Sequence, residues 1–337
     1  MEPRGPSKKE CLIITHDNAF HMDDVIACFM LRKIYPNSTI VRTRDSEIIK
    51  TGDIVVDVGG VFDEENRRYD HHQKGFHETY SKSYNVKLSS AGLVYKYHGK
   101  EFIKAIGIEF DDSLASELFI STLYNTYFVS VDANDNGIDI SDSVKYNQRV
   151  LDDMVKSFVP YNLSPVYSFE EAESIRYEAF LEAMEYMGSD LIRHCNKLAY
   201  DVSHNGKRLN EEYLALGEKN DYYLVLTQGG VFSKDIIYYY NNLYKKKIHM
   251  IISPRKTMKG NTYSIQSIPD QHQSKYKPLI PLCEEWRGLR NEELRRVSGL
   301  ADIEFVHATG FCGSAETLET AITMAEESIK EYLENKE

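Results

Sequence analysis

Short β-rich runs alternate with helical segments near the start of the chain, and this alternation restricts the fold more than any other feature. The runs at 11–15, 38–43 and 53–59 (CLIIT, STIVRT and DIVVDVG) have the length and β-branched content of buried strands. Residues 23–35 place apolar side chains at helical spacing and end before Pro36. Strands that alternate with helices pair in parallel, because a parallel connection needs a crossover. The sequence therefore predicts an α/β fold with a mostly parallel sheet and helices on both faces.

Helical patterns follow this alternation and then give way to short β runs. Residues 88–99 have the pattern of a helix that begins at Ser89 or Ser90 and ends at Gly99. Residues 114–137 form a long apolar helix that leads into a polar, glycine-terminated loop. Later β runs and helices are expected at 222–227, 246–253, 261–268, 291–298 and 315–335.

The length of 337 residues is typical of two domains rather than one. The 42% of hydrophobic residues is enough to fill two sizeable cores. Most of 160–210 has the amphipathic spacing of packing helices. We therefore expect an α/β domain at 1–160, a helical connector at 161–204 and a smaller α+β domain at 205–337.

Charge and cysteine content exclude several classes of protein. The 52 acidic and 40 basic residues give a net charge of −12, which argues against broad, non-specific nucleic-acid binding, because that binding depends on Lys and Arg. The five cysteines are scattered and form no CxxC pair, so neither a disulfide framework nor a zinc ribbon is expected. No apolar signal region is visible at 1–10, and no apolar run approaches the ~20 residues of a membrane span. We expect a soluble intracellular protein without membrane contact; cytoplasm, nucleus and mitochondrion all agree with the sequence.

Metal-competent side chains follow the predicted strands in four separate segments. In parallel sheets, ligands gather at the carboxyl ends of the strands, so these segments should meet at one edge. A single Asp-His-His run is more often a solvated turn, but four such segments at one edge favour a binding site. The candidates are His16, Asp17, His21, Asp23 and Asp24 after the first strand, Asp57 after the third, Asp70, His71 and His72 beyond it, and Asp132 and Asp135 at the end of the long helix.

The mixture of side chains selects the metal. No cysteine belongs to the set, which argues against a structural zinc site. Carboxylates with some imidazole suit Mn²⁺, Mg²⁺ or Fe²⁺. Six or seven ligands are too many for one octahedral ion that keeps water, but they suit two ions bridged by a shared carboxylate, a pair that performs phosphoryl hydrolysis. We expect two divalent cations, Mn²⁺ first and Mg²⁺ as the alternative.

The order of these residues resembles the DHH phosphoesterase superfamily, and the chain is most similar to its Myg-type (melanocyte proliferating gene) exonuclease branch. The shared stretches are FHMDDVIAC, IVRTRD, DIVVDVGG, RYDHHQKGF, LSSAGLVY, VDANDNGI, EEWRGLR and FVHATGF. The resemblance implies a two-domain hydrolase with a dinuclear site between a metal-binding catalytic domain and a substrate-binding domain. By this resemblance the first ion is held by His16, His21 and Asp57, and the second by Asp23, Asp57, His71 and Asp132.

The resemblance also implies roles in catalysis and substrate binding. Asp57 would act in catalysis by bridging the ions, and His72 would face the substrate phosphate. In the second domain, Arg287, Arg290 and His307 would meet the substrate together with the turn that contains Gly310 and Gly313. For each arginine, helix capping or ion pairing is an equal alternative. The family is described as trimming RNA from its 3′ end, in mitochondria and in the nucleus or nucleolus.

The chain departs from the family pattern at three places. HDNAFH stands where relatives have His-Ser-Gly-x-Phe-His, so the glycine is replaced by Asn18 and Asp17 adds a carboxylate. Asp24 stands where Glu is usual. Ser314 and Glu316 stand where the family tends to carry Gly and Lys. If that turn holds a substrate phosphate at a helix N-terminus, Glu316 opposes the phosphate.

Three functions follow from these observations. The first is a metal-dependent phosphodiesterase that hydrolyses nucleic acid, as a 3′–5′ RNA exonuclease. The second is a hydrolase of short oligonucleotides or a small phosphoanhydride, which the acidic balance favours because long RNA prefers a basic track. The third is a non-catalytic metal-binding scaffold. RNA or a short oligonucleotide is the expected partner, and a homo-oligomer is compatible with the sequence.

Overall fold

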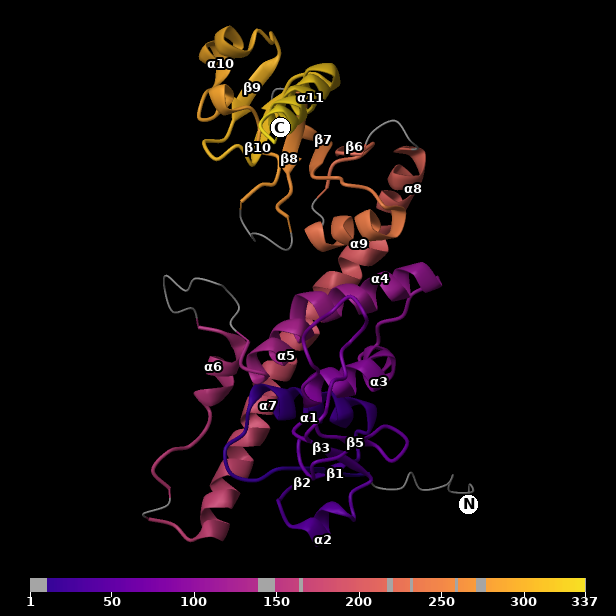
Figure 1. Ribbon diagram of the computed structural model, residues 1–337, viewed down its shortest axis with the longest axis vertical. Coiled ribbons are helices and arrows are strands. Elements are labelled where there is room, and N and C mark those ends of the chain that lie inside the picture. Colours follow the sequence, from indigo (N-terminus) through magenta and orange to yellow (C-terminus); the bar gives the residue numbers. More distant parts are fainter. Residues whose placement is uncertain are drawn as a thin grey trace. The chain divides into compact units, whose positions relative to one another are not determined.

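The computed structural model of the chain describes residues 11–138, 149–163, 166–216, 221–230, 233–257, 260–270 and 277–336. The chain divides into two compact units, Met1–Ala199 and Tyr200–Glu337. Each unit contains one five-stranded sheet with helices (Figure 1). The expected α/β class with a second, smaller unit is therefore confirmed. Most of the stretch predicted as a connector, 161–204, belongs to the first unit.

The first sheet has the strand order β2-β1-β3-β5-β4. β1 pairs in parallel with β2 and β3, and β3 pairs in parallel with β5; only β4 is antiparallel to its neighbour. The carboxyl ends of β1, β3 and β5 consequently lie at one edge, as the alternation predicts. The strands are β1 (Leu12–Thr15), β2 (Thr39–Arg42), β3 (Ile54–Val56), β4 (Phe62–Asp63) and β5 (Arg68–Tyr69).

The two faces of this sheet are covered unequally. α1 (Met22–Ile34) packs along α3 (Ser90–Ala105) on one face, and both contact the strands. On the other face Ile14 and Val55 pack with Ile49 of α2 (Ser46–Ile49), a single turn of helix. α3 is N-capped by Ser89, whose side chain accepts a hydrogen bond from the Gly92 N–H. Burial of ten residues of α1 makes this helix the centre of the unit.

A π-helical turn interrupts the long helix expected at 114–137. α4 (Ser113–Leu123) continues through Tyr124–Phe128, which has π-helical hydrogen bonding, into α5 (Val129–Asp135). The extra residue of a π turn rotates the following helix by about 100° relative to a regular one, and such turns occur often at functional sites. The turn therefore decides which face of α5 meets the sheet edge.

The second sheet has the order β6-β7-β8-β10-β9, with β6 parallel to β7 and the other neighbours antiparallel. α11 (Leu318–Glu334) contacts β7, β8 and β10 and closes a core against them. The helix predicted from residue 315 begins three residues later, because Ala315 ends β10 and Thr317 is the N-cap. The remaining elements are α8 (Lys207–Leu216), β6 (Tyr223–Val225), α9 (Lys234–Tyr244), β7 (Met250–Thr257), β8 (Gly260–Ser267), α10 (Asn291–Ser298), β9 (Ile303–Val306) and β10 (Cys312–Ala315).

Two further helices of the first unit are α6 (Leu151–Lys156) and the 33-residue α7 (Phe169–Asp201). α7 approaches α1 at Gly188, where an added Cβ would lie 2.1 Å from a ring carbon of Phe29. Among the described residues, no helix combines the length and apolar character that crossing a bilayer requires.

We expect Gly188→Ala to destabilise the protein, although alanine is the better helix former by about 1 kcal/mol. Overpacking against Phe29 should outweigh that gain and cost about 2 kcal/mol net. Urea unfolding followed by circular dichroism measures the effect, with the neighbouring exposed Ser189→Ala as the control. Phe29→Leu combined with Gly188→Ala should recover part of the loss. Equal unfolding midpoints for Gly188→Ala and the control would show that the helices do not approach here.

Candidate metal centre

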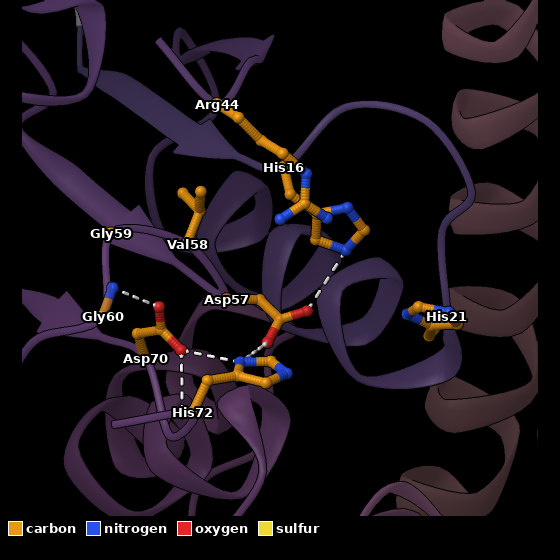
Figure 2. Close-up of a pocket in the computed structure, with 9 residues that line it drawn as sticks. All are labelled: His16, His21, Arg44, Asp57, Val58, Gly59, Gly60, Asp70 and His72. Carbon is orange, nitrogen blue, oxygen red and sulfur yellow. Dashed lines mark hydrogen bonds and ion pairs between the residues drawn. The ribbon is translucent and has the colours of Figure 1, made fainter. Parts of the chain in front are cut away.

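Asp57 directly follows β3 and has a backbone φ of +55°, in the left-handed region that non-glycine residues rarely adopt. Such strain persists where the surrounding structure fixes it, which is often at functional sites. Its carboxylate lies between two imidazoles: Oδ2 is 3.2 Å from His16 Nε2, and Oδ1 is 3.2 Å from His71 Nε2. Figure 2 shows Asp57 at the centre of the pocket. Asp57 therefore has one oxygen available on each side.

His16 and His21 lie on the first side of Asp57. His16 Nδ1 lies 2.9 Å from the carbonyl oxygen of Asp17. A carbonyl oxygen can only accept, so Nδ1 is the donor in this hydrogen bond. That bond leaves Nε2 as the basic nitrogen that faces Asp57. His21 is the N-cap of α1, and its ring centroid is 5.6 Å from that of His16. His16, His21 and Asp57 bring one ligand atom each within 4.8 Å of one another.

The loop between the two histidines compensates for the missing family glycine. Asn18 occupies that position and adopts a φ of +67°, which asparagine tolerates better than most residues. Arg42 Nη2 donates to the Asn18 carbonyl at 2.7 Å. Phe20 is buried in edge-to-face contact with Phe180 of α7, which anchors the loop. The departure at Asn18 is therefore compatible with the loop geometry.

Asp23, His71 and Asp135 form the group on the second side of Asp57. Their ligand atoms also lie within 4.8 Å of one another. Asp135 Oδ2 is 3.2 Å from His71 Nε2, and Asp23 Oδ2 is 3.8 Å from the same nitrogen. Asp23 Oδ2 accepts a hydrogen bond from Ser90 Oγ at 2.8 Å. Asp24 forms a further group with Asp23 and Asp57, and its Oδ1 accepts from the His21 N–H at 2.7 Å.

The structure does not bring Asp132 into this cluster. Asp132 Oδ1 accepts from both the N–H and the hydroxyl of Ser89, and Oδ2 accepts from the Tyr124 hydroxyl at 2.7 Å. Both oxygens are thus engaged in support of the N-terminus of α3. Asp135, one turn further along α5, takes the place that the sequence assigned to Asp132. The π-helical turn sets this rotation, and no pattern in the sequence signals that turn.

His72 is held by Asp70 at the mouth of the pocket. Asp70 Oδ1 accepts from His72 Nδ1 at 2.8 Å and from the His72 N–H at 3.0 Å, while Oδ2 accepts from the Gly60 N–H at 2.6 Å. The His72 side chain remains 64% exposed, and the hydrogen bond from Nδ1 leaves Nε2 as the free nitrogen. The hydrogen bond with Asp70 is the main cause that raises the pKa of His72.

The pocket has a volume of about 330 Å³. Arg44 lies at its rim beside His16, with Nε 3.3 Å from Asp17 Oδ1 (Figure 2). Asp17, the extra carboxylate of this chain, therefore contacts a cation. Arg44 lies in the shared stretch IVRTRD, but the sequence did not assign it to the site, because its nearness to the strand ends arises only in the folded chain. The lining residues are His16, His21, Arg44, Asp57, Val58, Gly59, Gly60, Asp70 and His72.

Burial and mutual repulsion dominate the acidity of the carboxylates. Burial is the largest cause that raises the pKa of Asp24 to about 7. Burial, with the charge of Asp23 next, raises the pKa of Asp135 to about 8. The pKa of Asp23 is also raised, first by burial and then by the charge of Asp57. These carboxylates are therefore costly to ionise together without a cation.

The pKa shifts of His16, His71 and Asp57 favour the charged forms of these three side chains. Burial by itself would lower the pKa of His16, but the charges of Asp24 and Asp57 raise it to about 9. Burial opposes the ionisation of Asp57, yet the imidazoles of His16 and His71, each 3.2 Å from one of its oxygens, hold the pKa of Asp57 below its usual range. The cluster thus draws positive charge to itself.

Unpartnered buried atoms in the cluster fit bound divalent cations. Among the described residues, the buried side-chain atoms without a hydrogen-bond partner include several of this cluster, and buried polar groups are normally paired. Carboxylate oxygens and imidazole nitrogens without cysteine suit Mn²⁺ or Mg²⁺ rather than a structural zinc ion. The atoms concerned are Asp23 Oδ1, Asp24 Oδ2, Asp57 Oδ1, His71 Nε2 and Asp135 Oδ2.

Apart from His72, the residues predicted to bind substrate lie in the second unit. Arg287 Nε donates to the Leu282 carbonyl at 2.8 Å, and an added Cβ on Gly310 would lie 2.9 Å from the same nitrogen. Arg290 is the N-cap residue of α10, and its Cζ lies 4.1 Å from the ring centroid of Phe305.

The turn after β9 contains His307, and the two positions that differ from the family pattern, Ser314 and Glu316, follow it. His307 Nδ1 lies 3.0 Å from Thr309 Oγ1, and Gly313 is in β10. Glu316 Oε1 accepts from Arg295 Nη2 at 2.7 Å, so the residue that stands in place of the family lysine already has a cationic partner. Ser314 is a buried residue of β10.

Fold and site together define an α/β protein with a candidate metal centre at the carboxyl edge of a parallel sheet. A sequence model of the MYG1 exonuclease family, described as an uncharacterised protein family (UPF0160), matches residues 12–329. The chain therefore belongs to the MYG1 exonuclease family, which confirms the resemblance seen in its motifs.

Curated relatives match over most of their length. A MYG1 protein of Caenorhabditis elegans is 33% identical over 338 residues, which cover 96% of each chain. The MYG1 exonuclease of Mus musculus is 34% identical, with 96% of this chain and 86% of the mouse protein covered. A MYG1 protein of Saccharomyces cerevisiae is 28% identical, with 96% and 97% covered.

Two solved structures are distantly similar. A pGpG-specific phosphodiesterase, PggH, from Vibrio cholerae has a TM-score of 0.27 and 12% identity, with 96% of this chain and 98% of that chain covered. An exopolyphosphatase-related protein from Bacteroides fragilis has a TM-score of 0.22 and 12% identity, with 96% and 92% covered. At these scores neither similarity bears on the fold or the function.

Asp135→Asn and Asp132→Asn should separate metal binding from support of the fold. Asp135→Asn removes a charged oxygen from the cluster, so we expect Mn²⁺ affinity to fall at least about 10-fold while the thermal midpoint without metal is unchanged or higher. The amide oxygen that Asp132→Asn introduces can still accept from Ser89, so this variant should retain more metal affinity. Isothermal titration with Mn²⁺ and thermal melts measure both effects. A larger loss of Mn²⁺ affinity for Asp132→Asn would return Asp132 to the ligand set.

Proposed function

We propose that the chain is a metal-dependent phosphodiesterase that hydrolyses nucleic acid, as an exonuclease that trims single-stranded RNA from its 3′ end. The observation that carries this proposal is the placement of Asp57 between two groups of imidazole and carboxylate ligands. Membership of the MYG1 exonuclease family supports hydrolysis of phosphodiester bonds. The metal-centre residues belong to four segments of the chain that meet at one sheet edge. This convergence of ligands favours a catalytic centre over a non-catalytic metal-binding scaffold.

The proposed centre holds two divalent cations, Mn²⁺ first and Mg²⁺ as the alternative. His16, His21 and Asp57 would hold one ion, and Asp23, Asp57, His71 and Asp135 would hold the other, so Asp57 would serve both. Such ions supply Lewis acidity, which makes water nucleophilic near neutral pH and stabilises charge on a phosphoryl group. Asp57 contributes to catalysis by fixing the two ligand groups relative to each other.

The pocket residues position the substrate phosphate. His72 lines the pocket, and Asp70 accepts a hydrogen bond from its Nδ1, which leaves Nε2 free. In its protonated form His72 donates a hydrogen bond to a phosphate oxygen. Arg44 at the rim adds a guanidinium that can bind phosphate through two N–H groups.

Two alternative functions predict different results in hydrolysis assays. A hydrolase of short oligonucleotides or of a small phosphoanhydride is favoured by the acidic balance of the chain, with a net charge of −12. A non-catalytic metal-binding scaffold would bind Mn²⁺ without turnover. Labelled single-stranded RNA, DNA, dinucleotides and pyrophosphate, each assayed with Mn²⁺ and with EDTA, discriminate among them. Absence of hydrolysis for every substrate with Mn²⁺ would overturn the proposal in favour of the scaffold.

Asp57→Asn and His71→Ala should abolish hydrolysis of RNA while they preserve the fold. Asp57→Asn removes a charged oxygen that faces both ligand groups, and His71→Ala removes the imidazole of one group. We expect each change to lower kcat/KM by more than about 100-fold. Glu316→Gln, a surface change in the second unit, is the control and should retain activity. Anomalous scattering from crystals with Mn²⁺ tests the bridge, because two ions are expected beside Asp57. A single tetrahedral ion, or near wild-type turnover of either variant, would contradict the assignment.

Asp70→Asn should lower activity through the orientation of His72. Asparagine lacks the negative charge that stabilises protonated His72, so the pKa of His72 should fall toward its ordinary value and the pH at which activity declines should fall with it. The pH profile of kcat/KM for RNA hydrolysis measures this shift, and His72→Gln provides the comparison without a titrating group. A profile identical to the wild type would remove His72 from the reaction.

A further inference from the structure

His16 and His21 are five residues apart in the chain, yet the fold brings their ligand atoms together. Five extended residues can span about 17 Å, whereas one ligand atom each of His16, His21 and Asp57 lies within 4.8 Å of the others. Figure 2 shows the chain leaving His16 in an arc and returning to the pocket at His21. Such a loop is costly to order, because each fixed backbone residue loses conformational entropy. The arc therefore needs partners besides the two histidines.

Asn18, near the start of this loop, has both of its backbone polar groups bound by one pair of opposite charges. Its N–H donates to the carboxylate of Glu173, with both oxygens 3.2 Å from the nitrogen. Its carbonyl accepts from Arg42 Nη2 at 2.7 Å. Arg42 Nη1 lies 3.7 Å from Glu173 Oε2, so the two side chains also pair with each other. The left-handed backbone of Asn18 is thus held on both sides of the residue.

Arg42, the last residue of β2, is buried behind the loop. Only 2% of its side chain is exposed, and its Cζ lies 5.4 Å from the ring centroid of Phe20 and 5.1 Å from that of Phe180. Burial lowers the pKa of Arg42, and the charges of Asp24 and Glu173 oppose that shift. A guanidinium packed in this way has little freedom to move, so it fixes the carbonyl that it binds.

Glu173 belongs to a face of α7 that is packed on β2. Its Oε1 lies 2.5 Å from Arg176 Nη1, which orients the carboxylate. The Tyr177 hydroxyl, one turn further along, donates to the Ile40 carbonyl of β2 at 3.2 Å. Glu173, Tyr177 and Phe180 are spaced as neighbours on one side of a helix. The long helix therefore presents Glu173 to the loop from a fixed position.

We propose that Arg42 and Glu173 form a clamp on the backbone of Asn18. As positioning residues, they set the separation between His16 and His21, and so the affinity for the ion that these imidazoles would hold. The effect should be confined to that ion, because the ligands of the second ion lie outside the loop. This inference rests on the two-ion assignment of the proposed function and names what positions one of the two sites.

Isothermal titration of the full chain with Mn²⁺ measures both sites. We expect Glu173→Ala to weaken one site roughly 10- to 100-fold, the usual effect of losing a residue that orients a ligand, and to leave the other unchanged. Glu173→Gln should lose less affinity, because its amide oxygen can still accept from the Asn18 N–H. Glu178→Ala, which replaces an exposed glutamate of the same helix, is the matched control and should bind both ions as the wild type does. Anomalous scattering from crystals at limiting Mn²⁺ identifies the weakened site, which should be the one beside His16 and His21.

Amide exchange of residues 17–21 in EDTA tests the clamp without metal. Glu173→Ala should speed exchange of the Asn18 N–H, while the strand β1 keeps its protection. Equal exchange in the wild type and Glu173→Ala would overturn the clamp. An equal loss of affinity at both Mn²⁺ sites would also overturn it, because that result indicates general destabilisation.

Hydrolysis of RNA is judged separately from the clamp. A wild type that binds two Mn²⁺ ions but hydrolyses no substrate overturns the nuclease proposal and leaves the clamp in place. Hydrolysis by the wild type, together with unchanged Mn²⁺ binding by Glu173→Ala, overturns the clamp alone. A wild type that binds no ion beside His16 and His21 overturns both.

Discussion

Repulsion among buried carboxylates around Asp57 is the constraint on which the rest of the first unit depends. Asp23, Asp24 and Asp57 are at most 4% exposed, and burial, followed by the charge of Asp23, raises the pKa of Asp135. Like charges in a low-dielectric interior raise the free energy of the fold unless cations neutralise them. His16 and His71 supply part of that charge when they are protonated. Binding of divalent cations would replace those protons, so metal affinity, acidity and stability of this unit are linked.

The parts of this arrangement that follow a local rule were predictable from the sequence. Strand β-propensity with helices between predicted the parallel sheet, and parallel pairing predicted that His16, Asp57 and His71 meet at one edge. Capping chemistry predicted Ser89 as one of two candidates for the start of α3, and its side chain makes the N-cap hydrogen bond. The helix expected at 291–298 coincides with α10, because charges and apolar residues alternate there at helical spacing without interruption.

The parts that depend on tertiary contacts were not predictable. α3 continues to Ala105 past the expected end at Gly99, because Phe102 and Ile103 in its last turn are buried in the core. The choice of Asp135 over Asp132 depends on the π-helical turn, which shifts the phase of α5 without altering the apolar pattern. β9 was missed because Glu304 interrupts its apolar run, and β10 because it contains a glycine and a serine in its centre and no β-branched residue.

The N-terminus of α3 explains how the two ligand groups keep their geometry. Ser89 donates to Asp132 of α5, and Ser90 donates to Asp23 of α1, so two carboxylates from different helices meet the same helix end. The positive end of the helix dipole favours both charges. Gly92 makes this approach feasible, because a Cβ there would lie 2.2 Å from Asp132 Oδ1. Asp132 thereby fixes α5, and with it Asp135, relative to Asp23, so a residue outside the cluster determines the separation between two of its candidate ligands.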